Sequence, residues 1–319
     1  MKLAILVTGQ LRSFFDNDVL FSFQRLLSIS ASHYGSTDNI FLLFVVSGDF
    51  QSLDSYFKTT SYNYKIIPYS TPEYSYQFSQ ICHSIHANPQ FQTNKSAYLS
   101  IPSFAHTEIS DPEWYVNVGT MQFHQLQIGI QYLKQHHIAF DTILKTRFDI
   151  IYPHDFIPAF PTQEDSLDPI RRLTLTDSNY SKFMNTFTMF GFRNIGEYIS
   201  HMQTQSIQPP YYHVLPIYSD IAFGGPYFYN HPSITKILQN PSTDNILYSF
   251  GDFFFLSQRD VFFRLENYIN NYGCIPYSIP HFFAQEAQSV IFCLDNDIDI
   301  VMFTNDTYKV KRQEKNLNT

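Results

Sequence analysis

The chain has little cysteine, a single tryptophan and no hydrophobic run long enough to cross a bilayer. Its three cysteines, Cys82, Cys274 and Cys293, are far apart and lack the spacing of a metal site, which favours free thiols in a reducing compartment. The apolar residues that begin at Leu3 end at Val7, which is too short for the hydrophobic core of a signal peptide. We therefore expect a cytoplasmic protein without a transmembrane segment, and peripheral membrane contact stays open.

Positive charge is scarce as well. The chain carries 20 Lys and Arg against 28 Asp and Glu, so its formal net charge is −8 at pH 7. No basic block stands out before the last few residues, which argues against a nucleic-acid partner. A local pair such as Arg171 and Arg172 is still compatible with an anionic small molecule.

What the sequence does contain is an alternation of apolar runs and helical patterns. Leu3–Val7 and Ile40–Val46 are apolar without alternation, as strands buried on both faces of a parallel sheet are. A helical pattern between them ends near Gly35, and a weaker strand is expected at Tyr64–Ile67. Strand, helix and strand at this spacing predict a nucleotide-binding α/β half.

The length of the chain allows one large domain with ample core. We expect residues 1–152 to form the nucleotide-binding half and residues 153–308 to form a second half of the same domain. Residues 69–118 show little periodicity, and we interpret them as a long loop or insertion over the site. The polar residues 309–319 are expected to be a flexible tail.

The second half has a mixed pattern. Short β-prone segments are expected in three places: 172–176, 185–192 and 213–223. Ser257 is the expected N-cap of a helix that ends at Gly273. A final helix around 283–294 and a strand at 298–303 complete the predicted domain.

Polar residues follow the apolar runs in three places. These segments are Thr8–Arg12, Ser47–Asp49 and Lys145–Asp149, of which the last ends a strand that a helical pattern over 123–133 precedes. Ligands of open α/β sheets bind at the carboxyl ends of the strands, so we expect the three segments to form one site. A nucleotide-sugar site needs a nucleotide pocket, positive charge for the leaving diphosphate and a positioned acceptor hydroxyl.

Several of these residues have a ligand-binding and a structural interpretation. Gly9 would let a ligand approach the backbone, and Arg12 would pair with phosphate or lie on a helix surface. Asp49 would accept from a base or ribose hydroxyl, or cap a loop. Arg147 and Asp149 have the same parity on a strand, so they would form either an anion-and-metal site or a salt bridge at the end of the sheet. The predicted donor-binding residues are Thr8, Gly9, Gln10, Arg12, Asp49, Lys145 and Arg147.

With these motifs the chain resembles the GT-A-fold glycosyltransferases, in the nucleotide-diphospho-sugar transferase superfamily, that build bacterial and viral surface polysaccharide. The specific part is the run Phe-Asp-x-Ile-x-Lys-x-Arg-x-Asp from Phe140 to Asp149. Supporting parts are the Gly-Gln-x-Arg turn at Gly9, the helix with Met121, the Gly-Asp-x-Phe segment at Gly251 and Glu286 before a late helix. The resemblance implies a GT-A-like, Rossmann-like α/β fold, with a mixed sheet flanked by helices in a single large domain.

The resemblance also implies roles for individual residues. Asp149 takes the place of the second, metal-binding aspartate of the family's Asp-x-Asp pair, which implies a Mn²⁺ or Mg²⁺ cofactor. Arg147 stands where the family has the first aspartate, and it could itself neutralise the donor diphosphate. Asp252 matches the aspartate that faces the acceptor, as general base or acceptor anchor, although it could instead cap the next element. Glu286 would be a structural or acceptor-side residue.

These features together predict a glycosyltransferase that moves a sugar from a nucleotide-diphosphate donor to a saccharide acceptor in surface-glycan synthesis. Residues 1–152 would bind the donor and residues 153–308 the acceptor. One alternative is a catalytically inactive GT-A-like protein that binds a nucleotide or a glycan. A phosphohydrolase would need a second acidic cluster near the strand ends, and the sequence has none with suitable spacing.

Overall fold

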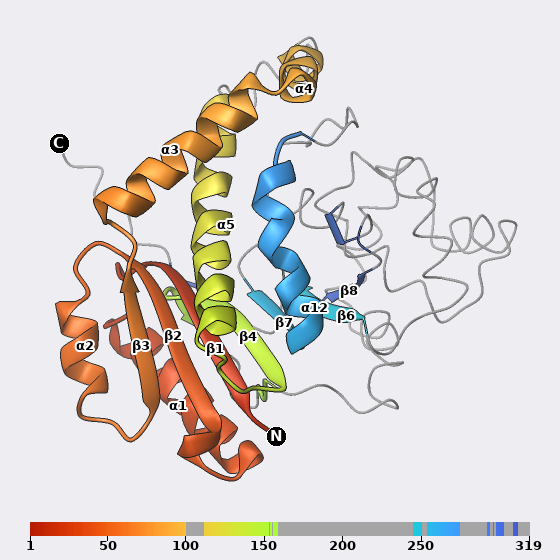
Figure 1. Cartoon of the computed structure of the whole chain (residues 1–319). Helices are drawn as coiled ribbons and strands as arrows, with labels where there is room; N and C mark the ends of the chain where they lie inside the picture. The colour runs from red at the N-terminus through yellow and green to blue at the C-terminus, as the bar shows by residue number, and fades with distance from the viewer. Residues whose placement is uncertain are drawn as a thin grey trace, which may run out of the picture.

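The computed structural model shows an α/β fold in which helices flank a mixed β-sheet (Figure 1). Among the described residues, seven strands form the main sheet in the order β3-β2-β1-β4-β7-β6-β8. This arrangement confirms the predicted α/β class with helices around a mixed sheet. The structure describes residues 1–99, 112–152, 154, 156–158, 245–250, 254–274, 292–293, 296, 298–302 and 309–311.

The sheet has a parallel part from the first half of the chain and a mixed part from the second. The parallel strands are β1 Leu3–Gln10, β2 Ile40–Ser47, β3 Asn63–Pro68 and β4 Thr142–Arg147. The others are β6 Ile246–Phe250, β7 Phe254–Gln258 and β8 Asp299–Met302. Strand β7 is antiparallel to both β4 and β6, so the two halves share one continuous sheet.

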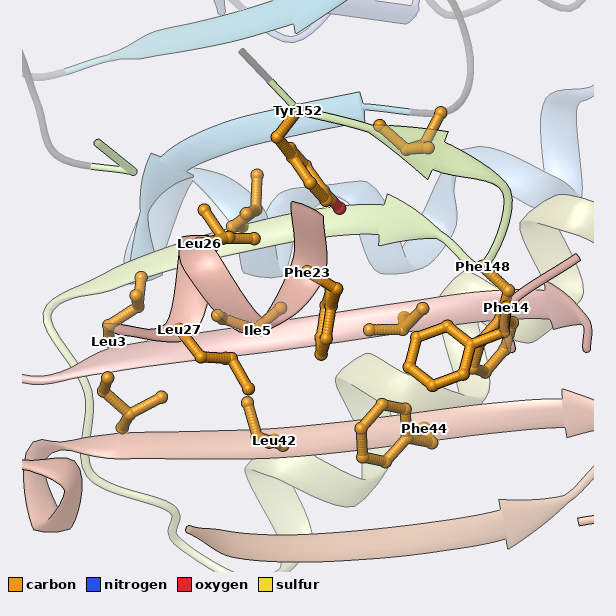
Figure 2. Packing of buried hydrophobic residues seen from close by; sticks show 14 of the residues in the cluster. Leu3, Ile5, Phe14, Phe23, Leu26, Leu27, Leu42, Phe44, Phe148 and Tyr152 are labelled. Atoms are coloured by element: carbon orange, nitrogen blue, oxygen red, sulfur yellow. The ribbon is translucent and has the colours of Figure 1, made fainter. Parts of the chain in front are cut away.

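Helix α1 Asn17–Tyr34 covers one face of the parallel strands. Its residues Phe23 and Leu27 belong to the same buried cluster as Ile5 of β1 (Figure 2). The helix ends, as predicted, at Gly35, which has a φ of 85° that a side chain would strain. The predicted strands and helix of this part are confirmed.

Helix α5 Pro112–Gln135 covers the opposite face and leads into β4. It lies directly on β1, because a Cβ atom at Gly129 would be 2.7 Å from Leu6 Cδ1. The chain therefore leaves β1 through α1 on one face and returns to β4 from α5 on the other. Such a change of direction between neighbouring strands is where open α/β sheets bind ligands.

The predicted loop over residues 69–118 is wrong for most of its length. Helices α3 Pro72–Ala87 and α4 Pro89–Leu99 and the first turns of α5 occupy it, and residues 100–111 lie outside the described part. Thr71 begins α3 by accepting a hydrogen bond from Tyr74 N, with Pro72 in the first turn. Only Cys82 and Ile85 of α3 are buried, and so narrow a face gives little apolar periodicity.

In the second half, helix α12 Arg259–Arg264 continues into the 3-10 helix η6 Leu265–Asn271. The predicted N-cap Ser257 is wrong by one residue, because Ser257 is buried in β7 and Gln258 precedes the helix. Gly273 follows η6 with a φ of 74°, and β8 confirms the strand predicted at 298–303. Outside the described residues lie the segments predicted at 172–176, 185–192 and 213–223, and all of the predicted helix around 283–294 but 292 and 293.

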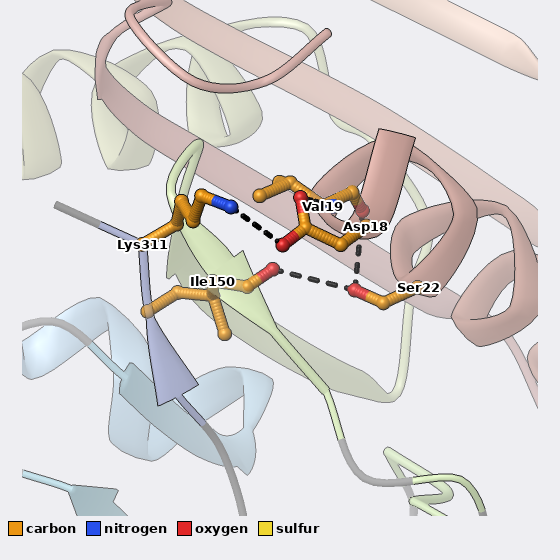
Figure 3. A network of polar contacts seen from close by, with 5 residues as sticks. All are labelled: Asp18, Val19, Ser22, Ile150 and Lys311. Carbon is orange, nitrogen blue, oxygen red and sulfur yellow. Dashed lines mark hydrogen bonds and ion pairs between the residues drawn. The ribbon is translucent and has the colours of Figure 1, made fainter. Parts of the chain in front are cut away.

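The predicted flexible tail 309–319 is wrong for its first three residues. Strand β9 Lys309–Val310 pairs antiparallel with β5 Ile150–Ile151. Lys311 Nζ lies 2.8 Å from Asp18 Oδ2 at the start of α1, while Ser22 of the same helix bonds the Ile150 carbonyl (Figure 3). Main-chain pairing of this kind leaves no trace in composition, which is why a polar segment resembled a tail.

Candidate functional site

The three polar segments lie side by side at the carboxyl edge of the parallel strands. Thr8 is in register with Arg147, and Gln10 is in register with Ser47. Leu6, which has the same parity as Thr8 on β1, contacts α5, so these polar residues leave the sheet on the face that α5 covers. The side chains of three strands and one helix therefore share a single edge.

Arg147 and Asp149 form a two-pronged ion pair at this edge. Arg147 Nε lies 3.0 Å from Asp149 Oδ1, and Nη2 lies 2.6 Å from Oδ2. The side chains are 30% and 18% exposed, so the pair is partly shielded from water. Strand β4 ends at Arg147, which places Asp149 in the following turn rather than on the strand. The salt bridge, which was one of the two interpretations of the sequence, is present.

The turn that carries Asp149 is held from the far end of the described chain. Lys311 N donates to the Asp149 carbonyl oxygen at 2.7 Å. On the other side of the turn, the Thr146 and Tyr152 hydroxyls are 2.6 Å apart and both buried. Burial raises the pKa of the Tyr152 hydroxyl, so it stays protonated, and either hydroxyl can donate to the other. The backbone of the turn that carries the Asp149 carboxylate is therefore held in place.

Lys145 is a buried cation beneath this edge. Its side chain is 1% exposed, and its Nζ lies 5.2 Å from the centroid of the Phe255 ring on β7. Buried lysines are rare, and an aromatic face is one of the surroundings that stabilise their charge. In the sheet Lys145 pairs with Leu6, on the face that α5 covers. This pair lies two residues further from the carboxyl edge than the pair of Thr8 and Arg147. Its amino group therefore lies on the inner side of the edge, against β7.

The end of β1 combines a buried hydroxyl with an exposed polar turn. Thr8 is buried, while Gln10 and Arg12 are exposed, and Arg12 Nε donates to Gln10 Oε1. Gly9 has a φ of 122°, which glycine adopts far more readily than other residues, and a Cβ atom there would only touch Phe148 at 4.0 Å. Gly9 is itself only partly buried, and its backbone conformation is the feature that requires glycine here.

Asp49 follows β2 and has the capping role that the sequence also allowed. Its Oδ1 accepts from Gln51 N at 2.9 Å, at the start of α2 Gln51–Phe57. Gly48, with a φ of 95°, donates from its backbone N to Ser70 Oγ at 3.1 Å. The loop is thereby connected to the turn after β3. The exposed Asp49 side chain remains at the carboxyl edge of the sheet.

Two buried polar residues of α5 belong to this edge and were missed by sequence reasoning. Gln125, 2% exposed, donates from Nε2 to Ser47 Oγ at 2.7 Å. His124 Nδ1 lies 2.9 Å from the Tyr69 hydroxyl, and burial lowers the pKa of this histidine to about 4. A polar pair between the core positions Phe123 and Leu126 was the available signal, because polar residues inside an apolar stripe are usually hydrogen-bonded.

The remaining predicted site residues are not among those that the structure describes. Asp252 and Glu286, like Arg171 and Arg172, lie outside the described residues. Within the part of the chain that is described, no group of three or more His, Cys, Asp or Glu side chains could hold a metal ion. Across the same ranges, none of the helices has the length and apolar character needed to span a membrane.

Comparisons with protein-family models, curated proteins and solved structures found no match to this chain. Its function is therefore inferred from the chemistry of the residues at the carboxyl edge of the sheet.

Proposed function

We propose that the protein is a glycosyltransferase with a GT-A-like fold, which moves a sugar from a nucleotide-diphosphate donor to a saccharide acceptor in surface-glycan synthesis. The observation that carries the proposal is the meeting of Thr8, Ser47 and Arg147 at the point where the chain changes direction between β1 and β4. Nucleotides bind at this point in open α/β sheets. The positive charges gathered there suit the diphosphate of a donor sugar.

These residues would act by electrostatic stabilisation of negative charge. Departure of a nucleoside diphosphate places negative charge on its oxygens, and fixed cations lower the energy of that charge. Arg147 and Arg12 would bind the diphosphate, and the buried Lys145 would add positive potential. Gly9 and the Ser47–Asp49 loop would hold the nucleoside.

Asp149 is the residue proposed to hold Mn²⁺ or Mg²⁺. A single carboxylate suits a hard cation that takes its other oxygens from phosphate and water, and it does not suit an ion held by protein alone. When bound, the ion would act as a Lewis acid toward the leaving diphosphate. Arg147 would neutralise part of the same negative charge through its guanidinium.

The acceptor half of the proposal depends on Asp252 as general base or acceptor anchor. The residues that flank its segment, Phe250 of β6 and Phe254 of β7, are paired with each other. Lys145 pairs with Phe255 in the antiparallel β4·β7 ladder, so these flanking residues lie at the edge where β4 ends. This position supports an acceptor site next to the donor site.

A catalytically inactive nucleotide- or glycan-binding protein is the second candidate. It is favoured by the Arg147–Asp149 ion pair, in which both carboxylate oxygens already accept hydrogen bonds. A protein that had lost the first aspartate of the metal pair could retain this arrangement and still bind a nucleotide.

Thermal-shift measurements with UDP, GDP, CMP and their sugars, each with Mn²⁺ or with EDTA, test the proposal. A selective rise in melting temperature for one nucleotide is expected, and no response to any of them would refute nucleotide binding. Release of nucleotide from the matching donor sugar, with and without saccharide acceptors, then separates the two candidates. The inactive protein would bind the nucleotide without releasing it from the sugar.

A further inference from the structure

The turn between β4 and β5 connects the carboxyl edge of the main sheet to the two-stranded sheet. Strand β4 ends at Arg147 and β5 begins at Ile150, so Phe148 and Asp149 form the turn. Phe148 is 2% exposed and belongs to the buried apolar cluster. Asp149 instead contributes its carboxylate to the ion pair with Arg147 at the site edge. The position of the Asp149 main chain therefore determines where this carboxylate lies.

Strand β9 reaches the main chain of Asp149 through the residue that follows it. Val310 pairs with Ile150 in the two-stranded sheet. The next residue, Lys311, donates from its backbone N to the Asp149 carbonyl oxygen at 2.7 Å. The Lys311 side chain extends to α1, where its Nζ lies 2.8 Å from Asp18 Oδ2 (Figure 3). Lys311 thus connects the turn to α1 as well as to β9.

Helix α1 also holds the residues that follow Asp149. Ser22 Oγ donates to the Ile150 carbonyl oxygen at 3.4 Å and accepts from Tyr152 N at 3.2 Å. Arg25 Nη2 donates to the Tyr152 carbonyl oxygen at 2.7 Å. These bonds fix β5 on α1, whereas the bond from Lys311 acts on the peptide group of Asp149 itself. The two sets of contacts can therefore be separated by mutation.

The Asp149 carboxylate in turn orients the guanidinium of Arg147. Arg147 Nε and Nη2 donate to the two carboxylate oxygens at 3.0 and 2.6 Å, and the Arg147 side chain is 30% exposed. Two parallel hydrogen bonds define the plane of the guanidinium, which one bond would not do. An arginine that is already oriented loses less conformational freedom when an anion binds to it.

We propose that Lys311 is a positioning residue of the donor site, because its backbone N–H holds the Asp149 turn and thereby keeps the Arg147 guanidinium in one orientation at the carboxyl edge. The inference rests on the proposed function, in which Arg147 binds the donor diphosphate. Lys311 acts only through Asp149 and does not bind the donor. Its ion pair with Asp18 is 42% and 46% exposed, so it contributes less than the backbone bond does.

The test is the rate of hydrogen exchange at the Arg147 Nε–H, measured by NMR without any nucleotide. This proton lies in the bond to Asp149 Oδ1, and loss of its resonance in Arg147→Lys assigns it. Lys311→Pro removes the backbone donor, so exchange should be at least about tenfold faster than in the wild type. Asp18→Asn removes the ion pair and keeps that donor, so exchange should stay within about threefold. Wild-type exchange in Lys311→Pro would overturn the inference.

A second measurement uses the wild type alone and covers the case in which Lys311→Pro does not fold, as circular dichroism would reveal. If the Lys311 bond holds the turn, every opening of that bond also exposes the Arg147 Nε–H. The Arg147 proton should therefore be no more protected from exchange than the Lys311 amide. A protection of Arg147 that exceeds that of Lys311 by more than about tenfold would show that the ion pair persists without the bond, and the inference would be wrong.

Nucleotide affinity separates this inference from the proposed function. Isothermal titration calorimetry with the nucleotide that stabilises the wild type most should show at least about fivefold weaker binding in Lys311→Pro, and a change within about twofold in Asp18→Asn. Equal binding by Lys311→Pro and the wild type would overturn the role of Lys311 and leave the donor site standing. If the wild type binds no nucleotide, the donor site itself is wrong, and the exchange measurements still decide whether Lys311 positions Arg147.

Discussion

Replacing Gln125 by leucine would remove one hydrogen bond between α5 and the end of β2. The Nε2 atom of Gln125 lies 2.7 Å from Ser47 Oγ, and the glutamine is 2% exposed while Ser47 is half-buried. Loss of one partner in such a bond costs about 1 kcal/mol when water can still reach the group left behind. If the bond fixes the Ser47–Asp49 loop for the nucleotide, the same energy corresponds to roughly fivefold weaker binding.

The chain offers a matched control on the same helix. Gln127 is a partly buried glutamine, and its Nε2 donates to the Glu266 carbonyl oxygen at 3.1 Å, which connects α5 to η6 and not to the sheet. Gln125→Leu and Gln127→Leu should each lower the melting temperature by about 2 °C. Only Gln125→Leu should weaken binding of the nucleotide that stabilises the wild type most, as measured by isothermal titration calorimetry.

Ser47→Ala removes the same hydrogen bond from its other end. The double variant with Gln125→Leu should therefore bind the nucleotide about as well as either single variant, which corresponds to a coupling energy of about 1 kcal/mol. Additive losses would show that the two side chains act separately. Equal loss of nucleotide affinity in Gln125→Leu and Gln127→Leu would refute a specific role for the bond at the site.

Three further changes test other parts of the structure. Asp149→Ala should abolish release of nucleotide from the donor sugar, and wild-type turnover in this variant would contradict the site. Urea titration should show that the free energy of unfolding falls by only about 1 kcal/mol. Burial lowers the pKa of His124 from 6.5 to about 4, so as the pH falls the histidine is protonated in the unfolded chain before it is protonated in the folded protein. The free energy of unfolding should therefore fall by roughly 3 kcal/mol as the pH drops from about 6.5 to about 4. In urea titrations across that range, His124→Gln should weaken the pH dependence, whereas the exposed His83→Gln should keep it. Gly119→Ala would place a Cβ atom 2.1 Å from the hydroxyl of the buried Tyr272, which should cost about 1–3 kcal/mol and be partly relieved by Tyr272→Phe in thermal melts.

The sequence predicted the elements whose signals are local. Unbroken apolar runs indicated β1 and β2, and Gly35 marked the end of α1 because only a left-handed residue completes that turn. Helix α3 was missed because its buried face is narrow, and β9 was missed because Val310 pairs with Ile150, far away in the chain. Local patterns carry no information on such distant pairing.

The same distinction holds for the site. Arg147 and Asp149 are two residues apart, so their proximity followed from the sequence, although their hydrogen-bond geometry did not. Gln125 and Ser47 are 78 residues apart, and only the packing of α5 on the sheet brings them together. A buried glutamine in an apolar stripe indicates that a partner exists, but it does not identify the partner.

Lys311 has a consequence for how the protein is made. Its backbone N bonds the carbonyl of Asp149, and its side chain bonds Asp18, which lies 293 residues earlier in the chain. Because synthesis proceeds from the N-terminus, α1 and the turn that carries Asp149 emerge from the ribosome long before these contacts can form. The turn that carries Asp149 therefore acquires this backbone restraint only after residue 311 has been made, which makes completion of the turn a late event in folding.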